Sequence, residues 1–168
     1  MKRYYILTFV TAVIVALGFL LTKLGLGWKF STPTRWDKPL IKHPILWEKF
    51  TTLNNLEVIG RRRPYTEKEM QLLRRAIHDP YHEIRAMAIA ALENATHDPK
   101  QREEAIKLIM PCLKDPEWLV RSYAVRALAR LKVKDAVPHI LPLLNDPRPE
   151  VREAAEDALK ELGYQVRK

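Results

Sequence analysis

The sequence predicts an all-α fold, in which a solenoid of three helical hairpins follows one N-terminal transmembrane helix. Three observations support this prediction. A 14-residue motif recurs three times in the C-terminal part of the chain, apolar residues at helical spacing precede each copy, and a 19-residue stretch near the N-terminus carries no charge. Repeats with a period of 20–50 residues are typical of solenoids, because each unit buries its apolar face against its neighbours.

The uncharged stretch is residues 4–22, YYILTFVTAVIVALGFLLT, bounded by Lys2-Arg3 and Lys23. As a helix it measures roughly 28 Å, close to the ~30 Å hydrocarbon core of a bilayer. We therefore expect an uncleaved membrane anchor. A cleaved signal peptide is the main alternative, since the start is basic and residues 16–18, Ala-Leu-Gly, form a small-x-small cleavage site. A buried core helix is a third interpretation.

Basic residues on both sides of this stretch bear on its orientation. Four follow it closely, Lys23, Lys29, Arg35 and Lys38. The positive-inside rule then favours a cytoplasmic C-terminal domain, although a short basic N-terminus ahead of an anchor points the other way. We expect a single-pass membrane protein with its repeats on the cytoplasmic side.

Residues 23–65 form a basic linker that contains prolines. Prolines at positions 33, 39 and 44 exclude a long helix before residue 45. Within residues 45–56 the apolar positions recur at helical spacing, which predicts a short amphipathic helix. Two interpretations remain open: the helix covers the exposed end of the solenoid, or it lies in the membrane interface. We favour the first, because a short array needs such a cap.

The net charge of +9 is concentrated before the repeats. Residues 1–65 hold 11 Lys/Arg against 3 Asp/Glu, whereas residues 66–168 hold 18 against 17. A solenoid that wraps nucleic acid needs its charge on the repeats, so we expect no nucleic-acid partner. The triplet Arg61, Arg62 and Arg63 is either a solvated basic loop or a contact with anionic lipid headgroups.

The repeated motif is D-P-x-x-x-[IV]-R-x-x-A-x-x-A-L, with copies that begin at Asp79, Asp115 and Asp146. Its Ile or Val, its two alanines and its Leu share one face of a helix, and the small alanines let neighbouring helices approach closely. We expect the motif arginine to pair with the turn aspartate of an adjacent unit. The residues with this structural role are Asp79, Arg85, Asp115, Arg121, Asp146 and Arg152.

A second helix is predicted ahead of each motif copy. Thr66 and Glu69 form an S/T-x-x-E capping box at the start of the first. Pro111 and Pro142 fall at equivalent positions and should kink the later two. The predicted helix–turn–helix units are residues 66–96, 97–132 and 133–163, followed by a tail, residues 164–168.

The motif resembles the HEAT-repeat family, and in particular the short bacterial repeats that are similar to phycobilisome-lyase HEAT-like repeats. The resemblance covers residues 66–163. It implies an α-α superhelix whose second helices line a concave face that binds other proteins. We therefore expect a membrane-tethered scaffold with an unidentified protein partner. The alternatives are an exported soluble protein and a lyase-type module that assists an enzyme.

We expect no catalytic, cofactor or metal site. Related di-iron enzymes place His-Glu pairs on successive repeats, but here His82-Glu83 aligns with Trp118-Leu119 and Pro149-Glu150. Candidates for partner binding lie on the second helices of the last two units. They are Trp118, Tyr123, Arg126, Arg130, Asp157 and Glu161. For Trp118, packing between adjacent helix starts competes with a role as a partner anchor.

Overall fold

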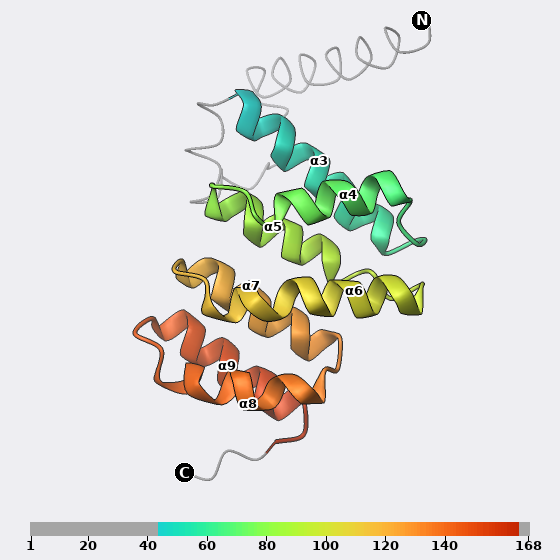
Figure 1. Cartoon of the computed structure of the whole chain (residues 1–168). Coiled ribbons are helices and arrows are strands. Elements are labelled where there is room, and N and C mark those ends of the chain that lie inside the picture. The colour runs from blue at the N-terminus through green and yellow to red at the C-terminus, as the bar shows by residue number, and fades with distance from the viewer. Residues whose placement is uncertain (1–43, 165–168) are drawn as a thin grey trace, which may run out of the picture. The chain divides into compact units, whose positions relative to one another are not determined.

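The computed structural model describes residues 44–164, and this part of the chain is all helical (Figure 1). The predicted transmembrane helix, residues 4–22, and the linker up to residue 43 lie outside the described residues, as do residues 165–168. Within the described range, no helix combines the length and the apolar composition that a membrane crossing requires.

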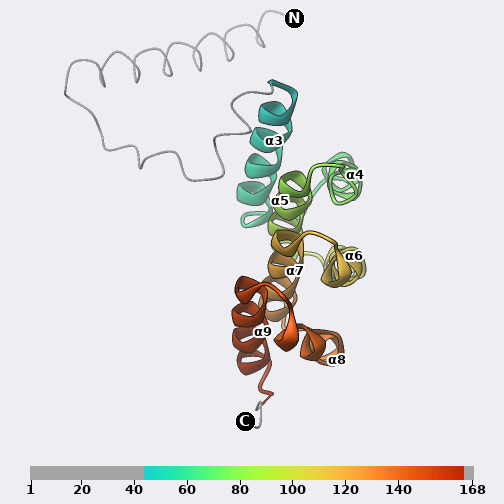
Figure 2. The same ribbon diagram turned by 90° about the vertical axis from the view of Figure 1, so that its left-hand side faces the viewer.

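The helices form two rows, which separate clearly in Figure 2. The inner row stacks α3 on α5, α5 on α7, and α7 on α9. The outer row is formed by α4, α6 and α8. The inner helices are α3 (Pro44–Gly60), α5 (His82–Leu92), α7 (Trp118–Arg130) and α9 (Pro149–Glu161), and the outer helices are α4 (Glu67–Ala76), α6 (Pro99–Ile109) and α8 (Val137–Ile140).

Two outer helices begin at side chains that cap their free N–H groups. At the start of α4 the hydroxyl of Thr66 accepts from the backbone N–H of Glu69 at 3.3 Å. The carboxylate of Glu69 in turn accepts from the N–H of Thr66 at 2.7 Å, so the predicted capping box is present. At the start of α6 the Asp98 side chain accepts from the N–H groups of Lys100 and Gln101.

Proline shortens the outer helices of the second and third units. Because proline lacks an N–H and its ring crowds the preceding turn, an α-helix does not continue through it undisturbed. The chain changes from α-helix to 3-10 helix one residue before Pro111 and again before Pro142. These 3-10 helices are η1 (Met110–Lys114) and η3 (Leu141–Asn145), and a third, η2 (Lys134–Ala136), precedes α8. The predicted kink is thus a change of helix type.

The apolar stripe of the motif forms the core between the rows. Its leading residues Ile84, Val120 and Val151 are fully buried, at 1% exposure or less. Its alanines and leucines are buried with them: Ala88, Ala91, Leu92, Ala124, Ala127, Leu128, Ala155, Ala158 and Leu159. Alanine at these positions removes side-chain bulk where helices meet, which permits the close stacking of the inner row.

Helix α3 is a degenerate fourth copy of the motif. Pro44 and Lys49 precede Pro80 and Arg85 by 36 residues, the interval that also separates the first two copies. The helix packs on α5 and runs to Gly60, four residues beyond the expected 45–56. It buries the leucines Leu46, Leu53 and Leu56. Three positions that are apolar in α5 (Ile84, Ala88 and Ala91) are polar in α3 (Glu48, Thr52 and Asn55).

The other end of the inner row is polar because of substitutions on α9. On α7, the residues Ser122, Val125 and Ala129 are buried. Their equivalents on α9, 31 residues later, are Glu153, Glu156 and Lys160, and all three are exposed. A charged outer face on a terminal repeat keeps it soluble without a further neighbour. Helix α9 therefore has the composition of a capping helix.

Candidate protein-binding surface

An arginine–aspartate pair joins the second unit to the third. The Nε and Nη2 atoms of Arg121 donate to the two carboxylate oxygens of Asp146 at 2.8 and 2.9 Å. The Nη1 atom donates to the carbonyls of Asp115 and Pro116, in the turn before its own helix, at 2.8 and 2.9 Å. One guanidinium therefore fixes a turn and a repeat junction together, and its planar array of donors suits both tasks.

The same contact recurs along the inner row. Arg85 binds both carboxylate oxygens of Asp115 at 2.9 and 2.8 Å. At the N-terminal end, Lys49 of α3 donates to Asp79 at 2.5 Å, so a lysine makes the first contact of the series. Each motif aspartate also accepts from the backbone N–H two residues later, as Asp146 does from Arg148 at 2.9 Å. We call this series of three pairs the charge ladder.

The ladder changes the proton affinity of its members. Burial opposes ionisation of Asp146, but hydrogen bonds from the Arg121 guanidinium and the Arg148 N–H outweigh it and lower the pKa of this carboxyl. The hydrogen bonds to Asp115 likewise raise the pKa of Arg85. The ladder carboxylate of Asp146 is therefore ionised at neutral pH, and its pair is a structural contact.

Five of the six predicted partner-binding residues, all but Trp118, lie on the exposed face of the inner row. Tyr123, Arg126 and Arg130 lie at spacings of three and four on α7, so they share one side of that helix. Asp157 and Glu161 are the equivalents of the last two on α9. Arg126, Arg130, Asp157 and Glu161 are exposed, and Tyr123 is half-buried. We call this side of the inner row the inner face. On α5 it includes Met87, which corresponds to Tyr123 in the repeat.

Ion pairs between helices hold one edge of the inner face. Arg130 at the end of α7 donates to Glu93, just after α5, at 2.6 Å. Burial raises the pKa of this glutamate, although the charge of Arg130 acts in the opposite direction. Lys132 donates to Glu161 of α9 at 2.6 Å. Two of the predicted candidates, Arg130 and Glu161, are thus engaged with neighbouring repeats, whereas Arg126 has no ion pair within the described residues.

Trp118 lies at the start of α7 and contacts the next unit. The Arg148 guanidinium sits over its ring, 4.9 Å from the centroid, in a cation–π arrangement. Arg148 also pairs with Glu150 at 3.2 Å. This placement favours packing between adjacent helix starts over an anchor for a partner.

The arginine triplet after α3 is largely engaged with glutamates. Arg61 donates to Glu57, in the last turn of α3. Arg63 binds both carboxylate oxygens of Glu69 at 2.9 and 2.8 Å, and these hydrogen bonds help to lower the pKa of Glu69 to about 2. Arg62 is exposed and has no ion pair within residues 44–164. Of the three candidates for lipid headgroups, Arg62 is the one whose charge is available.

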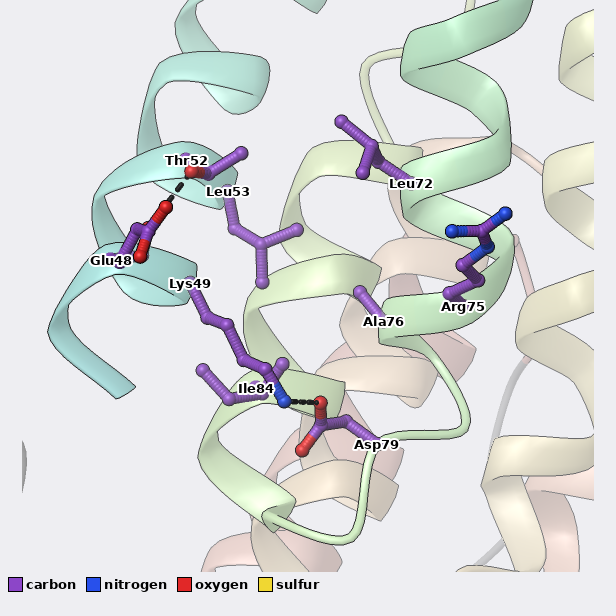
Figure 3. A pocket seen from close by; sticks show the side chains of 9 residues that line it. All are labelled: Glu48, Lys49, Thr52, Leu53, Leu72, Arg75, Ala76, Asp79 and Ile84. Carbon is purple, nitrogen blue, oxygen red and sulfur yellow. Dashed lines mark hydrogen bonds and ion pairs between the residues drawn. The ribbon is translucent and has the colours of Figure 1, made fainter. Parts of the chain in front are cut away.

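A cleft of about 400 Å³, which the sequence did not predict, lies between α3 and α4 (Figure 3). It lies where the degenerate motif copy has no outer helix of its own among the described residues. Apolar and charged side chains both line it: Glu48, Lys49, Thr52, Leu53, Leu72, Arg75, Ala76, Asp79 and Ile84. Only an alignment of α3 with the three repeats would have pointed to this position.

The single cysteine and the histidines form no metal site in the described part of the chain. No group of three or more His, Cys, Asp or Glu side chains in residues 44–164 is placed to hold a metal ion. Cys112 is buried in η1, and burial raises the pKa of its thiol to about 11. It is therefore an apolar packing residue at neutral pH.

Comparison with known proteins agrees with this architecture. The chain has no significant match among curated proteins. The sequence profile of one family, HEAT repeats, matches residues 69–160, which is more than half of the chain. The matched range contains the three ladder aspartates and both ladder arginines. On the recurring motif, the two rows of helices and this match, the chain belongs to the HEAT-repeat family.

Proposed function

We propose that the chain is a protein-interaction scaffold that residues 4–22 hold at a membrane. HEAT repeats provide a helical scaffold for protein interaction. The inner face is the observation that carries the binding part of this proposal. It places Tyr123 and Arg126 on one accessible side of α7. The residue of α9 that corresponds to Arg126 in the repeat is the exposed Asp157.

The inner face is suited to binding because it is held in place before a partner arrives. The ladder pairs and the Arg130–Glu93 pair tie successive inner helices together. A rigid surface loses little conformational entropy on association, which favours affinity. The carboxyls whose pKa is shifted include Glu69, Glu93 and Asp146, and each pairs with an arginine. We therefore propose binding and not catalysis.

Membrane attachment is supported by the sequence. Residues 4–22 are long enough and apolar enough to span a bilayer as a helix. Confinement to a membrane raises the effective concentration of the scaffold for a partner at the same surface. We place the repeats on the cytoplasmic side, because the residues that follow the span are basic.

Fractionation and mass measurement test the attachment. We expect the full-length chain in membranes washed with alkaline carbonate, with an intact mass that includes residues 1–22. A soluble chain whose mass corresponds to cleavage after Gly18 would contradict the anchor and support the exported alternative.

Thiol labelling tests the membrane side. Lys160→Cys places a cysteine on an exposed position of α9, while the native Cys112 is buried. A membrane-impermeant maleimide should label the Lys160→Cys chain in broken cells and not in intact cells. Labelling in intact cells would place the repeats outside.

A further inference from the structure

Within residues 44–164, no outer helix covers α3 as α4 covers α5. In α5 the positions Ile84, Ala88 and Ala91 are buried in the core between the rows. The equivalent residues of α3 are polar, whereas Leu53 lines the cleft, so a helix that covers α3 meets a mixed polar and apolar surface. The outer row therefore begins at α4 in the described residues (Figure 2). Leu72, Arg75 and Ala76 of α4 line the cleft.

The cleft has an apolar centre. Leu53 of α3, Ala76 of α4 and Ile84 of α5 contribute to its lining (Figure 3). Leu72 stands at its edge and is 44% exposed, which makes it one of the most exposed large apolar residues of the described chain. The Lys49–Asp79 pair closes one end, and its charges are satisfied. The centre is large enough to take an apolar side chain of leucine size.

Unpaired positive charge flanks this centre on α4. Lys68, Leu72 and Arg75 lie at spacings of four and three, so they form one stripe along the helix. Lys68 and Arg75 are exposed and make no ion pair within residues 44–164. Glu48, on the α3 side of the cleft, likewise has no ion pair there. The α4 side of the cleft is therefore basic around an exposed leucine.

The opposite side of α4 shows which chemistry joins neighbouring outer helices. Arg74 projects towards α6, and its Nη2 atom donates to the Glu104 carboxylate at 3.0 Å, while Nε also donates to that carboxylate. Arg74 also donates to Glu67 of its own helix at 2.6 Å. The outer helices α4 and α6 are thus joined by a basic residue on α4 and an acidic residue on α6.

We propose that an acidic amphipathic helix of a protein partner docks in this cleft and extends the outer row by one helix. An apolar side chain of the partner packs between Leu53 and Leu72, and its carboxylates pair with Lys68 and Arg75. This inference rests on the proposed scaffold function and adds a second binding surface, separate from the inner face. It assigns this surface an acidic ligand.

A pair of synthetic peptides tests the proposal on the purified full-length chain. Each is a stapled helix of about 16 residues, because shorter unsupported helices are marginal in water. The acidic peptide places a leucine between glutamates that match the spacing of Lys68, Leu72 and Arg75. The basic peptide has lysines in place of those glutamates. Fluorescence anisotropy measures the binding of each.

We expect the acidic peptide to bind the wild-type chain more tightly than the basic peptide. The double variant Lys68→Glu/Arg75→Glu should reverse this preference, with a loss of about tenfold for the acidic peptide. Leu72→Ala should weaken binding about fivefold, and Arg126→Glu on the inner face should leave it unchanged. All four positions are exposed in the structure, and circular dichroism establishes that each variant is folded.

Equal binding of the two peptides would overturn the proposal, as would acidic-peptide binding that is insensitive to Leu72→Ala. An intramolecular cross-link from a photoreactive residue at position 72 to the segment before Pro44 would also overturn it, since the chain would then fill the cleft itself. None of these results depends on membrane attachment or on partner capture at Tyr123. The proposed function can therefore fail without changing the peptide-binding result. Peptide binding at the cleft can likewise fail without contradicting the proposed function.

Discussion

Arg121 and Asp146 connect two repeats through a nearly buried, doubly hydrogen-bonded ion pair. Their side chains are 12% and 4% exposed, and the two contacts measure 2.8 and 2.9 Å. A buried charge is strongly unfavourable without its partner, so removal of either residue leaves the other uncompensated. The pair therefore makes the stability of one repeat depend on the presence of the next.

Replacing Arg121 with alanine should destabilise the array by about 3 kcal/mol, since Asp146 loses its partner and the turn carbonyls of Asp115 and Pro116 lose a donor. Urea unfolding followed by circular dichroism measures this change. The matched control is Lys107→Ala, which removes an exposed pair with Glu103 on α6 and should leave the midpoint unchanged. Similar midpoints for the two variants would refute a structural role for the ladder.

The lowered pKa of Asp146 predicts how stability depends on pH. An unfolded aspartate titrates near pH 3.9, and the folded group titrates lower, so the contribution of this carboxylate is complete above that pH and is lost as the pH falls through the folded pKa. Asp146→Asn removes the titration. Urea midpoints should therefore differ most near pH 7 and converge as the pH falls through the folded pKa. Parallel curves for the two proteins would contradict this linkage.

Gly60 tests whether α3 belongs to the array. Alanine is favoured over glycine by about 1 kcal/mol inside an isolated helix. Here an added Cβ would overlap the hydroxyl oxygen and the ring carbon Cζ of Tyr65. The hydroxyl is held in place because its one hydrogen is shared between the carbonyls of Leu56 and Ala91, at 3.1 and 2.7 Å. We therefore expect Gly60→Ala to destabilise the chain by about 2 kcal/mol in thermal or urea unfolding.

The double variant Gly60→Ala/Tyr65→Phe is the control for this mechanism, since it removes the hydroxyl, the nearer of the two Tyr65 atoms that the added methyl group meets, and frees the ring to shift. It should cost less than the sum of its two single changes. A stabilising Gly60→Ala would mean that α3 does not pack against the first repeat.

Cys112 provides a probe of local opening. Because burial raises the pKa of its thiol to about 11, little thiolate is present at neutral pH, and the sulfur is shielded. We expect its reaction with a disulfide reagent to be slow in the native protein and fast in urea. Arg85→Ala, which leaves the nearby Asp115 unpaired, should accelerate the native reaction. A fast reaction in the wild-type chain would contradict the packing of η1.

The repeats were predictable because their chemistry is local and recurs. The D-P turn, the apolar stripe and the Thr66–Glu69 capping box each depend on residues within one helix or turn, and all are present in the structure. The inter-repeat pairing of the motif arginine followed from the position of Arg121 beside the stripe. Because the motif occurs in three copies, its shared positions could be identified, which a single helix would not have allowed.

The sequence predicts the helix at α3 but does not reveal that it corresponds to the repeated motif. In its sequence His43 replaces the motif aspartate, Lys49 replaces the arginine, and Glu48 replaces the leading Ile or Val. Within the described residues α3 stacks on α5 alone, and these changes together conceal the motif. The contact of Trp118 with Arg148 was also beyond sequence analysis, because it depends on how two units stack.

The central claim is that a membrane-held HEAT array binds its partner through the inner face. Site-specific photocross-linking in native membranes tests it most directly, with the photoreactive residue at Tyr123 on α7 or at the exposed Glu103 of the outer helix α6. We predict a discrete protein adduct in the membrane fraction from position 123, reduced by Arg126→Glu, and none from position 103. Adducts from position 103 alone, or from position 123 only in the soluble fraction, would contradict the account.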